Sequence, residues 1–311
     1  MLQQLKYMKY FAVAGFKHVL KQNKPIQPDN QYCLDTAHAN VLIRERLLGD
    51  EPFMAGRLGS GEMLAFLKTI EVKMGIRKDI PQGNMDSMCI NAGFFPESQE
   101  MVLRFGDVME EACKQADLLG IWGTIPMEPY LLDTRFSHAK LCKLSGLEPF
   151  FAQEPWSEAL KGKKVLVIHP FEDTIRSQYA RREDLFPGRA VLPEFTLMTL
   201  KAVQTIAGQR DERFANWFEA LDYMYEEAMK KDFEVAILGC GAYGFPLAAR
   251  LKAAGKKVIH MGGSTQLLFG IRGQRWDQRE DFRTLFNDAW CRPGDTERPA
   301  GAKKIENSCY W

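Results

Sequence analysis

The sequence predicts an α/β protein with a Rossmann-like, doubly wound and largely parallel sheet flanked by helices. Two observations support this prediction. Short apolar runs alternate with helical patterns along the 311 residues, and glycine-rich turns follow several of the runs. The composition agrees, because 46% hydrophobic and 26% charged residues are close to globular averages. Disordered, collagen-like and coiled-coil chains are therefore excluded, and the length suits one α/β domain of two halves or two separate units.

The first half of the chain is expected to alternate between helices and strands. Gly49 and Pro52 are expected to end the first helix before the first strand begins. Residues 79–96 are rich in Pro, Gly and Asn, which indicates an irregular loop. The predicted elements are helix 29–48, strand 53–56, helix 62–70, helix 97–116 and strand 117–122.

The second half shows the alternation more clearly. In a doubly wound sheet, ligands bind beyond the carboxyl ends of the strands, so residues at these ends are the first candidates for a site. Residues 29–290 are expected to form this domain, and residues 291–311 a tail, mostly loop, with Tyr310 and Trp311 docked on the domain. The predicted elements are strand 164–168, strand 190–192, helix 196–207, helix 211–231, strand 233–238, helix 245–254 and strand 257–261.

Charge and cysteine usage narrow the class of partner. A net charge of +1 gives no general attraction for nucleic acid, so a small molecule is the expected ligand. The seven cysteines form no Cys-x-x-Cys pair, and their odd number favours reduced thiols in a cytoplasmic protein. No run of about 18 apolar residues is present, so no segment is expected to span a bilayer.

Residues 1–28 are predicted to form a basic amphipathic helix. Residues 1–24 contain five lysines and no acid, and apolar residues such as Leu5, Met8 and Phe11 recur at helical spacing. Such a helix can lie on the anionic inner face of a membrane as a peripheral anchor. It can equally pack on its own core or on a second subunit, as most amphipathic helices do.

The turn from Arg57 to Glu62 is the first candidate for a phosphate site. It lies between a predicted strand and a predicted helix, where free amides and the helix dipole favour an anion, and Arg57 can pair with phosphate. Glu62 can bind a divalent ion with the Ser60 hydroxyl as a weaker ligand. The alternative is a glycine turn, with Gly59 and Gly61, beside a surface glutamate that the helix dipole stabilises.

A Gly-x-Gly-x-x-Gly pattern follows the predicted strand 233–238. An NAD site would also need an acidic residue about twenty positions later, where the chain has Ile259, His260 and Met261 instead. The turn can let a nucleotide, sugar or phosphate approach the backbone, or it can serve only strand–helix packing. Its candidate binding residues are Gly239, Gly241, Tyr243 and Gly244.

Further polar residues follow other predicted strands. His260, Glu194 and His169, in that order, are candidates for the base that deprotonates a hydroxyl, although a histidine at a strand end is often purely structural. The residues that can hold a diphosphate and stack a base or sugar ring are Gly262, Gly263, Gln266, Arg272, Arg275 and Trp276.

These segments resemble a known family. Arg57-Leu-Gly-Ser-Gly-Glu62 resembles the Arg-x-Gly-Asp-Gly-Glu segment of bacterial glycosyltransferases of the GT-D fold. The turn 239–244, together with 257–263, resembles the strand-turn-helix-strand near the end of that domain. The resemblance implies a nucleotide-sugar donor, typically UDP-linked, and a divalent metal (Mn²⁺ or Mg²⁺) near an Asp-x-Glu motif. Ser60 replaces the Asp of that motif, so only Glu62 carries over as a metal ligand and as a catalytic residue.

The resemblance also implies an activity. We expect a glycosyltransferase that moves a sugar to a glycan, lipid-linked or protein acceptor in the synthesis of surface polysaccharide or glycoconjugates. Where Asp is missing, Arg57, Arg272 or Arg275 can neutralise the leaving diphosphate instead of a metal. Two alternatives remain at this point: an NAD-dependent oxidoreductase, and a non-catalytic partner subunit with the same fold.

Overall fold

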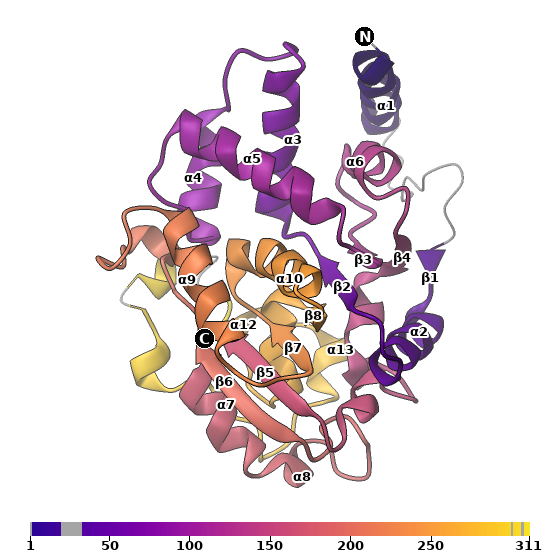
Figure 1. The fold of residues 1–311 in the computed structure, drawn as a ribbon, viewed down its shortest axis with the longest axis vertical. Helices are drawn as coiled ribbons and strands as arrows, with labels where there is room; N and C mark the ends of the chain where they lie inside the picture. The colour runs from indigo at the N-terminus through magenta and orange to yellow at the C-terminus, as the bar shows by residue number, and fades with distance from the viewer. Residues whose placement is uncertain (1, 20–32, 300, 306–307) are drawn as a thin grey trace.

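The computed structural model describes residues 2–19, 33–299, 301–305 and 308–311. Its centre is an eight-stranded sheet in the order β1-β4-β3-β2-β8-β7-β5-β6, with all neighbouring strands of this described part parallel (Figure 1). This sheet confirms the predicted fold class. The strands are β1 Cys33–Leu34, β2 Phe53–Arg57, β3 Leu118–Ile121, β4 Lys140–Lys143, β5 Lys164–His169, β6 Thr196–Lys201, β7 Val235–Leu238 and β8 Lys257–His260.

Helices cover both faces of the sheet. One core contains residues of α3, α5, α6, α9 and α10, and the other contains residues of α2, α7, α8, α11, α12, α13 and the C-terminal segment. The helices are α1 Leu2–Val19, α2 Thr36–Leu48, α3 Ser60–Lys73, α4 Gln82–Asn91, α5 Gln99–Cys113, α6 Glu128–Arg135, α7 Glu172–Tyr179, α8 Arg182–Leu185, α9 Trp217–Met229, α10 Gly244–Ala253, α11 Thr265–Leu268, α12 Gln274–Asp277 and α13 Glu280–Arg283.

The two cores follow from the alternation of side chains along each strand. In β2, Met54 packs into the first core, whereas Phe53 and Ala55 pack into the second. In β7, Ala236 and Leu238 face the first core, whereas Val235 and Ile237 face the second. Both faces are apolar because helices cover both, which is why these strands read as continuous hydrophobic runs in the sequence.

The order of the strands creates a switch point in the middle of the sheet. From β2 the chain proceeds through β3 and β4 towards one edge, whereas β5 to β8 fill the other half. β2 therefore lies between β3 and β8, and the connections on its two sides run in opposite directions. A crevice opens at the carboxyl ends of the strands at such a point.

Two predicted elements between residues 190 and 207 are wrong. Residues 190–192 form a turn rather than a strand, and residues 196–201 form β6 rather than a helix. β6 pairs with β5 in parallel register from Lys164↔Thr196 to His169↔Lys201. The segment Thr-Leu-Met-Thr-Leu-Lys is compatible with a helix or a strand on its own. It forms a strand because it can hydrogen-bond to the otherwise unpaired edge of β5.

Other predicted boundaries also shift. The predicted loop 79–96 contains α4, which is stabilised because Met85 and Met88 are buried. The predicted helix 29–48 begins only at Thr36, after the Asp35 cap, and its residues 29–32 lie outside the described part of the chain, as does the predicted domain boundary at residue 28. Similarly, the helix predicted from residue 211 begins at Trp217, capped by Asn216. β1, β4 and α6 were not predicted.

Two further expectations concern cysteines and membrane spans. All seven cysteines lie within the described residues, and none of them forms a disulfide bond there. Among the described helices, none is long and apolar enough to cross a membrane.

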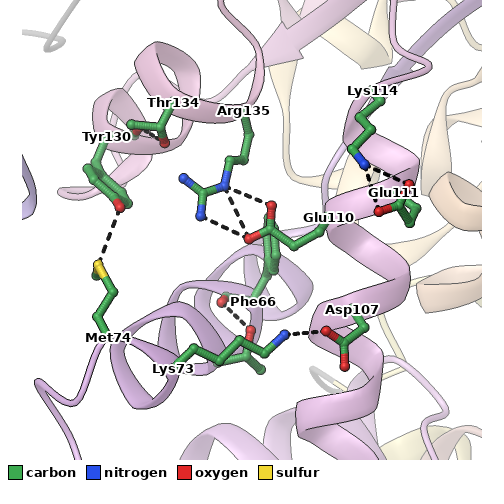
Figure 2. Close-up of polar contacts among 11 residues, drawn as sticks. Phe66, Lys73, Met74, Asp107, Glu110, Glu111, Lys114, Tyr130, Thr134 and Arg135 are labelled. Carbon is green, nitrogen blue, oxygen red and sulfur yellow. Dashed lines mark hydrogen bonds and ion pairs between the residues drawn. The ribbon is translucent and has the colours of Figure 1, made fainter. Parts of the chain in front are cut away.

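Polar contacts connect the helices of the first core at its outer side. Figure 2 shows Arg135 of α6 paired with Glu110 of α5, with Nε and an Oε atom 2.8 Å apart, and Lys73 of α3 paired with Asp107 at 2.6 Å. The Lys73–Asp107 pair lies at the surface, whereas the Arg135–Glu110 pair is largely buried. Both pairs connect neighbouring helices, and the exposed Lys73–Asp107 pair contributes little to stability.

Glu71 at the end of α3 is different, because its carboxylate is buried. It accepts hydrogen bonds from the Tyr7 hydroxyl at 2.6 Å, Lys68 at 2.6 Å and Arg77 at 2.8 Å. Burial acts to raise the pKa of Glu71, but the hydrogen bonds from Lys68, Tyr7 and Arg77 outweigh it, and the pKa lies below its usual value. This carboxylate joins α1 to α3.

We expect Glu71→Gln to lower the free energy of unfolding by about 3 kcal/mol, because two cations and a hydroxyl lose a buried charged acceptor. Urea unfolding at pH 7 measures this loss. Asp107→Asn, which removes an exposed ion pair, is the matched control and should cost at most about 1 kcal/mol. The contribution of Glu71 is complete above its usual pKa of 4.5 and disappears as the pH falls through the lowered value. Equal losses in the two variants would contradict this account.

Candidate functional site

A cavity of about 870 Å³ lies at the carboxyl ends of the strands. Every strand contributes a following segment to its wall, from Thr36 after β1 to His260 at the end of β8. Residues of α4, α12 and the C-terminal segment complete it. The volume is typical of a pocket for a small organic ligand.

Most of the site residues predicted from the sequence come together around this cavity. They are drawn from segments more than 200 positions apart, which only the sheet brings together. The predicted residues that line the cavity are Arg57, Gly59, Ser60, Gly61, Glu62, His169, Gly239, Gly241, Tyr243, His260, Gly262, Gly263, Gln266, Arg275 and Trp276.

Three predicted site residues do not line the cavity. Glu194 precedes β6, so it lies at the amino edge of the sheet, where its side chain is 80% exposed and faces Arg182. From the sequence, Glu194 was placed at the carboxyl end of a predicted strand 190–192, but these residues form a turn. The Arg272 side chain packs over the ring of Phe286 and faces Asp277 at 3.3 Å. Gly244 lies behind the wall, against the ring of His260.

Arg57 is the central cation of the site. It ends β2, and its guanidinium lies 4.6 Å from the ring centre of Trp122, which follows β3. Trp122 is held in turn by a hydrogen bond from its Nε1 to the Leu58 carbonyl at 2.9 Å. Arg57 makes no hydrogen bond or ion pair with any residue that the structure describes. Burial lowers the pKa of Arg57, although Tyr310 and Glu62 counteract this.

Glu62 lies in the first turn of α3, beside Arg57. Its carboxylate occupies the space next to Gly59, where a Cβ would lie only 2.0 Å from Oε2. Gly59 therefore allows the carboxylate to fold back over the start of the helix. Burial raises the pKa of Glu62, while its own backbone N–H and Arg57 act in the opposite direction.

The residues around Glu62 do not fit a divalent metal held by the protein. Within the described residues, no three His, Cys, Asp or Glu side chains come together as metal ligands. Glu62 provides a single carboxylate, and the positive charge of Arg57 beside it opposes a second cation. In this site, arginine is the cation available to an anionic ligand.

The glycine-rich turn accommodates two histidines. A Cβ on Gly239 would lie 2.6 Å from the ring of His169, and a Cβ on Gly244 would lie 2.1 Å from the ring of His260. Both rings are 3% exposed. Gly239 and Gly244 are therefore required for internal packing. Packing was one of the two roles predicted for this turn from the sequence.

The two histidines stay neutral and have opposite tautomers. Burial lowers the pKa of His169 to about 3, and burial, together with the charge of Arg57, lowers that of His260 to about 3. Nδ1 of His169 accepts from the N–H of Phe171 at 3.0 Å, so Nε2 carries the proton. Nδ1 of His260 lies 3.2 Å from the Leu238 carbonyl and donates to it, so Nε2 is unprotonated. His169 is therefore a hydrogen-bond donor at this nitrogen, not a base.

Glu148 is a site residue that sequence reasoning missed. It follows β4 and the short helical turn Leu144–Leu147, and it lines the cavity. Burial raises the pKa of Glu148 to about 7, although the Ser264 side chain and the charges of Arg57 and Arg279 oppose the rise. A carboxyl group with a pKa near neutrality can exchange a proton at physiological pH. No motif marks it, and β4 itself was not predicted.

The end of the chain forms part of the cavity wall. The ring of Tyr310 lies against Gly263 and stacks with the Arg275 guanidinium at 4.7 Å, and its hydroxyl accepts from Arg275 at 3.2 Å. Trp311 is buried, and its Nε1 donates to the Glu297 carbonyl at 3.2 Å. The expected docking of these two aromatic residues is confirmed, and it places Tyr310 beside the cations of the site.

Two other predicted ligand residues have structural roles. Tyr243 stacks flat on Trp217, with ring centres 5.0 Å apart, and its hydroxyl lies 3.0 Å from that of Thr205. Gln266 donates to the carbonyls of Ile271 and Tyr310, and so holds the C-terminal segment against α11. Its Oε1 is buried and has no partner among the described residues.

Comparison with known proteins finds one distant structural neighbour. No family model matches the chain, and no curated protein matches it. One similar solved structure is the highly conserved domain of unknown function 1792, described as having a distinct glycosyltransferase fold. The match covers 83% of this chain and 96% of that chain at 10% identity, with a TM-score of 0.38. A similarity at this level does not identify an activity.

The raised pKa of Glu148 predicts a pH-dependent stability. Its folded-state pKa of about 7 exceeds the usual 4.5, so the stability linked to its proton is complete below pH 4.5 and is lost as the pH rises to about 7. Glu148→Gln removes the buried charge, and should raise the melting temperature more at pH 8 than at pH 5. Thermal unfolding at both pH values measures the difference, with the exposed Glu154→Gln as the control. A shift in Glu148→Gln that is independent of pH would contradict the assignment.

Proposed function

We propose that this protein is a glycosyltransferase that takes its sugar from a nucleotide-sugar donor, with a UDP-linked sugar as the first candidate. The observation that carries the proposal is Arg57, a guanidinium in a deep cavity with no anionic hydrogen-bond partner among the described residues. A half-buried cation in such a place is stabilised by a bound anion. The resemblance of the segment 57–62 to bacterial glycosyltransferases supports a diphosphate as that anion.

The arginines provide the charge that a leaving nucleoside diphosphate requires. Transfer breaks the bond between the sugar and the diphosphate, so negative charge develops on the departing oxygen. Arg57 and Arg275 flank Tyr310 at this side of the cavity, and both influence one another electrostatically. Fixed cations in a water-poor site stabilise such charge strongly, because little reorganisation is required. A divalent metal is not needed in this account.

Glu148 is the candidate for the base that activates the acceptor hydroxyl. It lies in the same cavity as Arg57, on the segment that follows β4. With a pKa of about 7, it is partly ionised at neutral pH and can accept the proton as the hydroxyl attacks the sugar. His260 offers an unprotonated Nε2, but its pKa of about 3 makes it a weaker base. His169 can donate a hydrogen bond to the donor or the acceptor.

The structure gives less support to an NAD-dependent oxidoreductase. The space that a Cβ on Gly239 would take is filled by His169 and Thr265, so the first glycine of the motif has a packing role of its own. His260, rather than an acidic residue, ends β8, so no carboxylate is present at that position for the ribose hydroxyls. A non-catalytic partner subunit predicts weak or absent donor binding and is separated by the experiment below.

The acceptor and the cellular setting extend the same proposal. A glycan, a lipid-linked molecule or a protein can provide the hydroxyl, and the resemblance suggests surface polysaccharide or glycoconjugate synthesis. The cavity has room for the reacting part of an acceptor beside the donor, because its volume of about 870 Å³ lies near the upper end of small-molecule sites.

Donor binding is the first test of the proposal. Isothermal titration with UDP-sugars in the presence of EDTA should show binding, and Arg57→Ala should weaken it about tenfold to hundredfold, because a charge-assisted contact to the diphosphate is lost. Arg46→Ala, an exposed arginine on α2, is the control and should bind like the wild type. Binding of NAD(H) alone would favour the oxidoreductase, and binding of no nucleotide at all would favour the partner subunit.

The pH profile tests the role of Glu148. Since an ionised carboxylate is the active form of a base, kcat/KM should rise with pH through about 7 and then level off. Glu148→Gln should reduce kcat at least about hundredfold with a small effect on KM for the donor. An unchanged rate or an unchanged rising limb in this variant would assign the base to another residue.

A further inference from the structure

Helix α1 exposes a row of large apolar side chains to solvent. Leu5 is 62% exposed, Met8 53% and Phe11 56%, at intervals of three residues along the helix, and Val13 is also exposed. Four of the ten large hydrophobic side chains that are exposed in the described part of the chain lie on this one helix. Apolar residues scattered singly over a surface need no explanation, whereas a row on one helix indicates an interaction surface.

Polar contacts, rather than this row, hold α1 on the protein. The hydroxyl of Tyr7 donates to Glu71 at 2.6 Å, that of Tyr10 donates to Asp133 at 2.9 Å, and Lys6 pairs with Asp133 at 2.8 Å. Figure 1 shows α1 at the outside of the molecule, beside α6. A helix whose purpose was core packing would turn its leucine, methionine and phenylalanine inwards. This helix buries Tyr7 and leaves Leu5 and Met8 exposed, and Phe11 stacks on Tyr7 while remaining 56% exposed.

The net charge of the N-terminal segment, as its sequence gives it, identifies the kind of partner. Residues 1–24 contain five lysines and no acidic residue, although the whole chain has a net charge of only +1. A second copy of the same basic segment would be repelled, because both copies carry net positive charge. A surface of anionic lipid, in contrast, attracts lysines and accepts apolar side chains between its headgroups.

We propose that α1 docks the protein on an anionic lipid surface, with Leu5, Met8 and Phe11 inserted at the level of the headgroups. The body of the protein stays in water, because the hydrogen bonds of Tyr7 and Tyr10 hold the helix against α3 and α6. The attachment is peripheral, since it uses one face of one helix. This inference does not depend on the proposed catalytic activity.

Flotation of the full-length protein with vesicles tests the proposal. Vesicles of phosphatidylcholine alone are compared with vesicles that contain about 30% phosphatidylglycerol, at low and high salt. We expect binding to the anionic vesicles, weaker binding at high salt, and little binding to the neutral ones. The triple variant Leu5→Ser, Met8→Ser, Phe11→Ser should bind at least about tenfold more weakly, because each lost apolar side chain reduces insertion.

Controls separate this effect from misfolding and from dimerisation. Leu48 on α2 is 60% exposed, so Leu48→Ser is a matched loss of surface apolarity and should bind vesicles like the wild type. The triple variant should still unfold cooperatively with only a small loss of melting temperature, because its three residues are exposed and only Phe11 stacks on Tyr7. Equal binding of wild type and triple variant, or no binding to anionic vesicles, would overturn the proposal. A dimer that the triple variant loses, without vesicle binding, would assign the row to a second copy.

Discussion

The parallel pairing of β2 with β8 is the constraint on which the site depends. Phe53 pairs with Lys257 and Ala55 with Ile259, so segments about two hundred residues apart lie side by side. Since the strands are parallel and in this register, Arg57 and His260 reach the same edge of the sheet together. β3 and β7 extend the arrangement on either side, and their following loops complete the wall. A slip of one residue in this register would turn alternate side chains to the opposite face.

Burial then determines the chemistry of each titratable group at that edge. The same removal from water raises the pKa of Glu62 and Glu148, lowers that of Arg57 and keeps His169 and His260 neutral. Arg57 is the common neighbour, since Glu62, Glu148 and His260 all feel its charge. Low dielectric therefore serves two purposes here: it adjusts the proton affinity of the carboxyl groups, and it increases the attraction of a bound anion to the guanidinium.

Much of the fold could be predicted from the hydrophobic pattern along the sequence. The remaining parts depend on contacts between residues that are far apart in the sequence. Continuous apolar runs identified β2, β5, β7 and β8, because strands covered on both faces have that composition. β6 escaped prediction because its residues suit a helix until the edge of β5 is available. Glu148 escaped because neither β4 nor its following turn carries a motif, and its importance arises only from burial beside Arg57. The glycine-rich turn was found, but its packing against two histidines depends on side chains from other strands.

Helix α3 connects the cavity with the N-terminal helix α1. Its first turn carries Glu62 at the cavity, and its last turn carries Glu71, which holds α1. Fourteen residues of helix span about 20 Å, and a helix packed in the core is rigid over that length. α3 therefore acts as a spacer of fixed length. It sets how far the cavity stands from whatever surface α1 contacts, so an acceptor anchored in that surface would need to bridge a defined gap to reach Arg57.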